Sequence, residues 1–225
     1  MISKNIFKNL ESAYSSQSKI FYGESINLSN FKKTYSEAWE KYIFCLSKKN
    51  LKHFPEYLIK HSDEYCSFLL FLARQAYLEG DIELAICSYL INRRMNSFDC
   101  FYTRVIPDIF HLEHPIGSVI GNSELKNFLI IYQGVTIGSN LKSEAPSIDE
   151  KVVLFPNSTV IGSTKIGKNC AIGAGVQIYN EIIQDNSSVS FRKNGIMINS
   201  LKWSVRNKYF SCWLNYIKEE KIFRK

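Results

Sequence analysis

The sequence predicts an α+β protein in which a helical region is followed by a parallel β-helix and then by a further helix. Three observations carry this prediction. Apolar residues recur at helical spacing before residue 105, an aliphatic residue recurs at every sixth position in the middle of the chain, and helical spacing returns near residue 200. We therefore expect an α-helical domain at 1–104, a β-helix at 105–199 and a C-terminal helix at 200–225.

The first region contains three segments with the spacing of amphipathic helices. The first segment follows a candidate cap at Ser29 or Asn30, and its apolar residues are Phe31, Tyr35, Trp39, Tyr42 and Ile43. The second runs from Tyr65 to Glu79, where Gly80 can end a helix. The third continues to about Arg94, because Asp81 can cap its N-terminus. We expect these short helices to pack on one another.

The middle of the chain carries a row of aliphatic residues, one at every sixth position. The unbroken part of the row consists of Ile148, Leu154, Val160, Ile166, Ile172 and Ile178. A six-residue repeat is typical of a triangular coil, in which each repeat makes one short strand and one corner. An α-helix would place every sixth residue on a drifting face, and a flat strand would show period two. The row therefore predicts a parallel β-helix with the aliphatic side chains inside.

The same row extends upstream and is interrupted once. Its upstream members are Ile106, Leu112, Leu125, Ile131 and Ile137. The first two fit the phase after a slip of two residues around Ser118. Between Ile137 and Ile148 the spacing is eleven residues, and the intervening segment is polar and contains one proline. We expect this segment to be a loop that leaves a corner of the β-helix, where binding residues are often found.

The C-terminal region returns to helical spacing. Trp203, Phe210, Trp213 and Ile217 would share one face of a helix, with lysine and arginine residues between them. We expect this face to pack on the protein body or on a neighbouring subunit. Peripheral contact with a membrane surface is the alternative.

Composition and charge argue against several classes of protein. No stretch approaches about eighteen uninterrupted apolar residues, and the N-terminus lacks the pattern of a signal peptide, which favours a cytoplasmic protein. The net charge is +7, but basic residues are spread along the chain, so we expect anionic ligands and no nucleic acid. None of the six cysteines forms a C-x-x-C pair, which predicts reduced, buried thiols and no metal site.

Two of the four histidines lie where the β-helix begins. The inward direction of Leu112 places Glu113 and His114 at the adjoining turn, and His111 is close by. A carboxylate beside a histidine can hold one tautomer and make the imidazole a better base. The alternative is an incidental neighbour pair on the surface. His53 and His61 lie in the helical region, where we expect a solvated surface position.

The order of these regions and two motifs resemble the serine acetyltransferase family. The motifs are Glu113-His114-x-x-Gly117-x-Val119-Ile120-Gly121 and Gln133-Gly134-Val135-Thr136-Ile137-Gly138. The resemblance covers roughly residues 65–198 and implies a left-handed β-helix, acetyl-CoA as co-substrate and an O-acetyltransferase activity. It also implies that His114 is the general base and that Glu113 stands where the family has an aspartate. A second family aspartate falls on Asp99, counted seven residues back from the first hexad.

The resemblance implies a cofactor groove between subunits of a homotrimer, with a dimer of trimers as the alternative. Small or turn-forming residues would line the groove for the pantetheine arm: Gly138, Ser139, Pro156, Gly173 and Ala174. Arg192 and Lys193 would be available to the nucleotide phosphates. A phosphate-binding loop of the ATP or NAD type is missing from the sequence.

The polar loop departs from the family pattern. Family members carry Arg-His-Pro-Lys-Ile there, and the arginine and histidine help to hold the amino-acid substrate. This chain has Glu144-Ala145-Pro146-Ser147-Ile148, in which the proline and isoleucine keep the register. A carboxylate in place of the guanidinium would disfavour the carboxylate of free serine.

Three hypotheses follow for the function. The first is an acetyl-CoA-dependent O-acetyltransferase whose acceptor is a sugar hydroxyl, such as a unit of a surface polysaccharide or its precursor. The second is serine O-acetyltransferase of cysteine biosynthesis. The third is a non-catalytic trimeric scaffold protein, in which His111 and His114 would be incidental.

Overall fold

A computed structural model describes residues 4–24, 26, 31–49, 58, 60–193 and 195–210 of the 225-residue chain. Its N-terminal part consists of α1 (Lys4–Phe21), α2 (Phe31–Leu46), α3 (Ser62–Leu78) and α4 (Ile82–Asn96). The last three coincide with the predicted segments. As expected, Gly80 adopts a left-handed conformation after α3, and the side chain of Asp81 caps α4 by accepting a hydrogen bond from Leu84 N–H.

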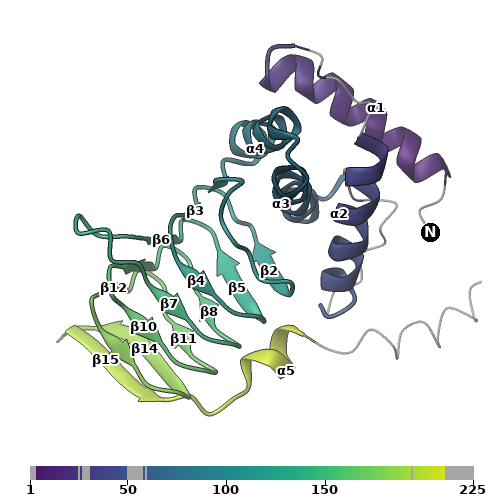
Figure 1. The fold of residues 1–225 in the computed structure, drawn as a ribbon. Coiled ribbons are helices and arrows are strands. Elements are labelled where there is room, and N and C mark those ends of the chain that lie inside the picture. Colours follow the sequence, from purple (N-terminus) through teal and green to yellow (C-terminus); the bar gives the residue numbers. More distant parts are fainter. Residues whose placement is uncertain are drawn as a thin grey trace, which may run out of the picture.

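Residues 99–192 form a three-sided solenoid of short parallel strands (Figure 1). Sheet A contains β1 (Asp99–Cys100), β3 (Val119–Ile120), β6 (Thr136–Gly138), β9 (Thr159–Ile161) and β12 (Gln177–Tyr179). Sheet B contains β2 (Phe110–Glu113), β5 (Leu129–Tyr132), β8 (Val153–Leu154), β11 (Ala171–Ile172), β14 (Ser187–Arg192) and β15 (Gly195–Ser200). Sheet C contains β4 (Glu124–Leu125), β7 (Ser147–Ile148), β10 (Lys165–Ile166) and β13 (Ile182–Ile183). From β2 to β14 the chain visits sheets B, A and C in turn, so three strands complete each coil and the α+β prediction is confirmed.

The predicted aliphatic row forms the interior of the solenoid. All six members from Ile148 to Ile178 are at most 3% exposed, and Leu112, Leu125, Ile131 and Ile137 are also buried. Ile106 differs, because it precedes β2, lies outside any strand and is only partly buried. The inward residue of β3 is Ile120, and the corner that precedes it absorbs the slip in phase.

The polar segment between β6 and β7 is a loop, as expected, and Leu141 at its tip is fully exposed. The helices gather at the end of the solenoid where β2 lies, and α3 packs on β2 (Figure 1). The aromatic rings of Phe71 in α3 and Phe110 in β2 lie 5.4 Å apart between their centroids. This contact fixes the first coil of the solenoid against the helical domain.

The C-terminal part differs from the predicted continuous helix. β15 pairs antiparallel with β14, and the only helix of the described C-terminal residues is α5 (Val205–Tyr209), which Ser204 caps. Residues 201–210, here called the strap, cover the outer face of sheet B through Leu201, Val205 and Phe210. The described part of this region therefore packs on the protein body, as expected. Trp213, Ile217 and the rest of the predicted helix lie outside the described residues.

Two further observations concern the thiols and membrane spans. Five cysteines are free, and they are buried as expected: Cys45, Cys66, Cys87, Cys100 and Cys170. Within the described ranges, no helix has the length and apolar character needed to cross a bilayer.

Candidate active site

The candidate site begins with the alternation of side chains along β2. Phe110 and Leu112 join the interior core, so His111 and Glu113 project from the outer face of sheet B. The parallel register places His111 beside Ile130 and Glu113 beside Tyr132 in the next coil. One strand thus carries two polar side chains on the same side.

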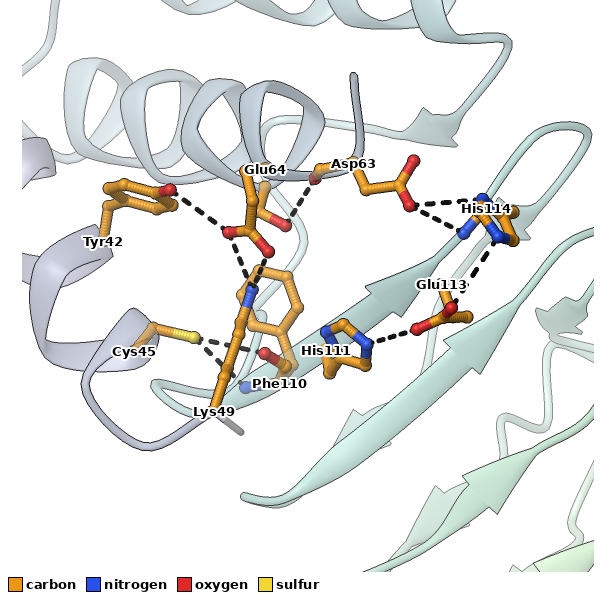
Figure 2. A network of polar contacts seen from close by, with 10 residues as sticks. Tyr42, Cys45, Lys49, Asp63, Glu64, Phe110, His111, Glu113 and His114 are labelled. Atoms are coloured by element: carbon orange, nitrogen blue, oxygen red, sulfur yellow. Dashed lines mark hydrogen bonds and ion pairs between the residues drawn. The ribbon is translucent and has the colours of Figure 1, made fainter. Parts of the chain in front are cut away.

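His114 follows at the corner, in the left-handed region with φ of 48°. Its backbone N–H donates to Oδ2 of Asp63 over 3.0 Å, and Asp63 belongs to the first turn of α3. Its ring lies between two carboxylates, with Nδ1 3.5 Å from Asp63 Oδ2 and Nε2 3.7 Å from Glu113 Oε1 (Figure 2). Because the side chain is 73% exposed, a substrate can reach the imidazole.

Glu113 lies between two histidines. Its Oε2 is 2.6 Å from Nε2 of His111, and its Oε1 faces His114 (Figure 2). The side chain of His111 is only 7% exposed, whereas that of Glu113 is 33% exposed. The carboxylate therefore connects a buried imidazole to an exposed one.

A cavity of about 310 Å³ opens at this place between α3 and the end of β2. It is lined by Lys60, His61, Ser62, Asp63, Glu64, His111, Leu112, Glu113 and His114. The sequence predicted Glu113 and His114 but not Asp63 or Lys60, which lie far away along the chain. His61 was expected on a solvated surface, but it is partly buried and lines the cavity; His53 lies outside the described residues.

A buried ion pair lies next to the cavity and includes Glu64, one of its lining residues. Lys49 is fully enclosed, and its Nζ lies 3.0 Å from Oε2 of Glu64, which also accepts a hydrogen bond from Tyr42 (Figure 2). Burial alone would lower the pKa of Lys49, but Glu64 and further neighbours raise it above its usual range. Burial and then Glu64 raise the pKa of Tyr42. The pair anchors the first turn of α3, which carries Asp63.

Asp99, the third predicted catalytic residue, has other partners. It lies in β1, where its Oδ1 accepts from the Tyr89 hydroxyl over 3.0 Å and its Oδ2 is 3.3 Å from Arg93. Both partners belong to α4. The structure thus brings Glu113 and His114 together, whereas Asp99 is engaged with the helical domain.

The predicted cofactor residues fall in three places. Pro156, Gly173 and Ala174 follow β8 and β11 at the same corner of the solenoid as His114. Three strand spacings of about 4.8 Å each separate the coil of His114 from that of Ala174. Gly173 also has a structural reason, because an added Cβ would lie 2.8 Å from the carbonyl oxygen of Val189.

Two of the other predicted cofactor residues lie away from this corner. Gly138 ends β6, and Ser139 follows it, so both lie at the opposite edge of sheet A. Arg192 ends β14 and Lys193 occupies the turn before β15, and both are exposed.

The loop that departs from the family pattern holds its carboxylate internally. Asn140 Nδ2 donates to Glu144 Oε2 over 2.6 Å, and Asn140 Oδ1 accepts from the backbone N–H groups of Lys142 and Glu144. Glu144 is thereby fixed within an exposed loop.

The chain is similar to known proteins in part of its sequence and in its fold. No protein-family model matches the sequence. The serine acetyltransferase of Bacillus pumilus is 30% identical over 112 residues, which are 45% of this chain and 51% of that protein. The serine acetyltransferase of Bacillus licheniformis is 28% identical over 97 residues, 41% of this chain and 45% of that protein. The chain thus spans about half the length of the curated relatives it matches.

Two solved structures share the fold. Serine acetyltransferase of Neisseria gonorrhoeae in complex with serine has a TM-score of 0.66 at 18% identity, covering 84% of this chain and 83% of that one. Serine acetyltransferase of Brucella abortus in complex with coenzyme A has a TM-score of 0.61 at 15% identity, covering 79% and 72%. Fold and repeat pattern first define the class: a hexapeptide-repeat β-solenoid protein with an N-terminal helical domain. Within that class, the chain is related to the serine acetyltransferases.

Proposed function

We propose that the protein is an acetyl-CoA-dependent O-acetyltransferase with His114 as its general base. The observation that supports this proposal most strongly is the exposed imidazole between Asp63 and Glu113 at the mouth of a cavity. The imidazole takes the proton of an acceptor hydroxyl while the hydroxyl oxygen attacks the thioester carbonyl. The carbon–sulfur bond then breaks, and the leaving thiolate of coenzyme A accepts the proton from the imidazolium. Glu113 and Asp63 stabilise the imidazolium that forms between these steps.

Acetyl-CoA would bind along the corner that carries His114. The Brucella abortus neighbour was solved with coenzyme A, which supports this co-substrate. Pro156, Gly173 and Ala174 would let the pantetheine arm approach the backbone, and Arg192 and Lys193 would pair with its phosphates. Gly138 and Ser139 lie at the opposite edge of sheet A, so they would line the same groove only from a second copy. We therefore propose a homotrimer, with a dimer of trimers as the alternative; light scattering on the purified chain would separate a monomer from both.

A sugar hydroxyl fits the acceptor side better than free serine does. Asp63 and Glu113 line the cavity without arginine among its described lining residues, and Glu144 is held within its own loop. The carboxylate of serine would be repelled by Asp63 and Glu113 and attracted only by Lys60 among the described lysine and arginine residues that line the cavity, whereas a neutral hydroxyl group would not be repelled. A unit of a surface polysaccharide or its precursor satisfies this requirement.

Thiol release from acetyl-CoA tests the proposal, with glucose, galactose and free L-serine as acceptors. We expect faster release with a neutral hexose than with L-serine. Exchange of His114→Ala should reduce the rate about 10²- to 10⁴-fold, the usual contribution of a general base. A His114→Ala variant with the wild-type rate would show that His114 is not the base.

Serine O-acetylation remains the second candidate function. It is supported by the curated relatives, which carry the name serine acetyltransferase, and by the Neisseria gonorrhoeae structure solved with serine. Robust acetylation of L-serine in the same assay would favour it and reject the sugar acceptor.

A non-catalytic trimeric scaffold is the third hypothesis, and coenzyme A binding separates it from the other two. A ligand that binds the native state raises the melting temperature. We expect a rise at millimolar coenzyme A. An unchanged melting temperature would favour the scaffold.

A further inference from the structure

We infer that His111 is a positioning residue that fixes Glu113 for its work on His114; this inference rests on the proposed function. His111 Nε2 and Glu113 Oε2 are 2.6 Å apart, which is the length of a strong hydrogen bond to a charged group. Both side chains project from the outer face of β2 two residues apart, so the strand itself sets their distance (Figure 2).

Burial determines which nitrogen of His111 carries the proton. Its Nδ1 is enclosed and has no hydrogen-bond partner in the part of the chain that the structure describes. A proton on Nδ1 would leave a buried donor unsatisfied, at a cost of about 1–3 kcal/mol. We therefore assign the proton to Nε2, whose N–H donates to the carboxylate of Glu113.

The hydrogen bond from His111 leaves the two oxygens of the Glu113 carboxylate with different partners. Oε2 is held by His111, and Oε1 is directed at Nε2 of His114 at 3.7 Å. This distance is longer than a hydrogen bond, and small movements that accompany substrate binding can close it. A fixed anion stabilises the imidazolium of His114 more effectively than a carboxylate that can rotate into solvent.

Other charged and titratable groups surround this arrangement. From α3 and the residues before it, Asp63, Glu64, Lys60 and His61 line the same cavity. From the strap, Tyr209 hydrogen-bonds to Tyr132, and its pKa is raised by burial, by Tyr132 and also by Glu113. His111 contacts Glu113 directly, at 2.6 Å.

Two substitutions separate positioning from packing. His111→Leu removes the donor, whereas His111→Gln places an amide N–H near the position of Nε2. We expect His111→Leu to lower kcat about tenfold or more, as loss of a hydrogen bond to a charged group implies, with KM for acetyl-CoA unchanged. His111→Gln should retain most of the activity, and equal losses in both variants would overturn the inference.

Imidazole NMR on the whole chain provides a readout that needs no substrate. The chain has only four histidines, so the ¹⁵N signals of His111 can be assigned by substitution. We expect the Nε2–H tautomer in the wild type and its loss or mixing in Glu113→Gln. If every acceptor fails, the proposed function falls, and this spectrum still decides whether His111 holds Glu113. A proton on Nδ1 alone would overturn the inference even in an active enzyme.

Discussion

At the scale of the residue, Lys49 is the most completely enclosed charge of the site. Its ammonium group is 0% exposed and lies against Glu64, which is 4% exposed. Exchange of Lys49→Met leaves the carboxylate buried without its counter-charge, and we expect a loss of about 3–5 kcal/mol in the free energy of unfolding. Denaturant unfolding measures this loss. Lys33→Met is the matched control, because Lys33 forms an exposed pair with Glu37 and should cost less than about 1 kcal/mol.

Buried thiols give the folded protein a dependence on alkaline pH. Burial raises the pKa of Cys87 to about 11 and that of Cys100 to about 12, from an ordinary value of 9.0. Because the folded state keeps these protons longer than the unfolded chain, their stabilisation is complete below pH 9.0 and is lost as the pH rises toward 12. We expect the melting temperature to fall above pH 9. A melting temperature that stays constant to pH 11 would contradict this assignment.

The sequence revealed only the local part of the candidate site. Glu113 and His114 are neighbours in a motif, so a pattern could identify them. Asp63 contacts His114 but lies 51 positions away from it along the chain. His111 differs from an ordinary strand residue only through its bond to Glu113. The predicted helix began at Tyr65 and did not include Asp63, which lies in the first turn of α3. An acidic residue there usually interacts with the helix dipole alone. Contacts between α3 and β2 require the packed structure.

At the scale of the element, the corner after β11 tests which glycines the solenoid requires. An added Cβ at Gly173 would lie 2.8 Å from Val189 O, whereas at Gly138 the nearest atom is Cδ1 of Ile161 at 3.9 Å. We expect Gly173→Ala to destabilise the fold by about 1–3 kcal/mol, as overpacking does, and Gly138→Ala to have little effect. Thermal unfolding compares the two. Equal melting temperatures of the two variants would mean that the backbone at the corner after β11 moves enough to accommodate the extra methyl group.

The elements that sequence patterns identified are those with a regular period. The six-residue row predicted the coils from Leu112 to Ile178, and apolar spacing with Asp81 and Gly80 predicted α3 and α4. The antiparallel strand β15 was not foreseen, because Ile196, Met197 and Ile198 are consecutive and mostly exposed. α5 ends at Tyr209 although the helical spacing continues, since packing of Phe210 on the outer face of sheet B overrides it.

At the scale of the whole molecule, the strap connects the last coil to the candidate site. Leu201 follows β15, while Tyr209 reaches Tyr132 beside Glu113. Val205 is fully buried between these ends. We expect Val205→Asp to cost several kcal/mol, since it buries a charge without a partner, and to disturb the cavity through Tyr209. Asn207→Asp adds the same charge on the exposed side of α5 and should be tolerated; equal damage from both would rule out a role for the strap contact.

The number of coils also sets the distance between residues along the axis of the solenoid. His114 follows β2, Arg192 ends β14, and four strand spacings of about 4.8 Å each separate these two strands in sheet B. Each coil adds one strand spacing to this separation, so a ligand that contacted both His114 and Arg192 would have to match the resulting distance. Removal of one coil between them would shorten the separation by one strand spacing. It would leave the imidazole of His114 and the carboxylates of Asp63 and Glu113 in place. The distance from His114 to Arg192 in this protein thus depends on the number of coils between them and not on the residues around the imidazole.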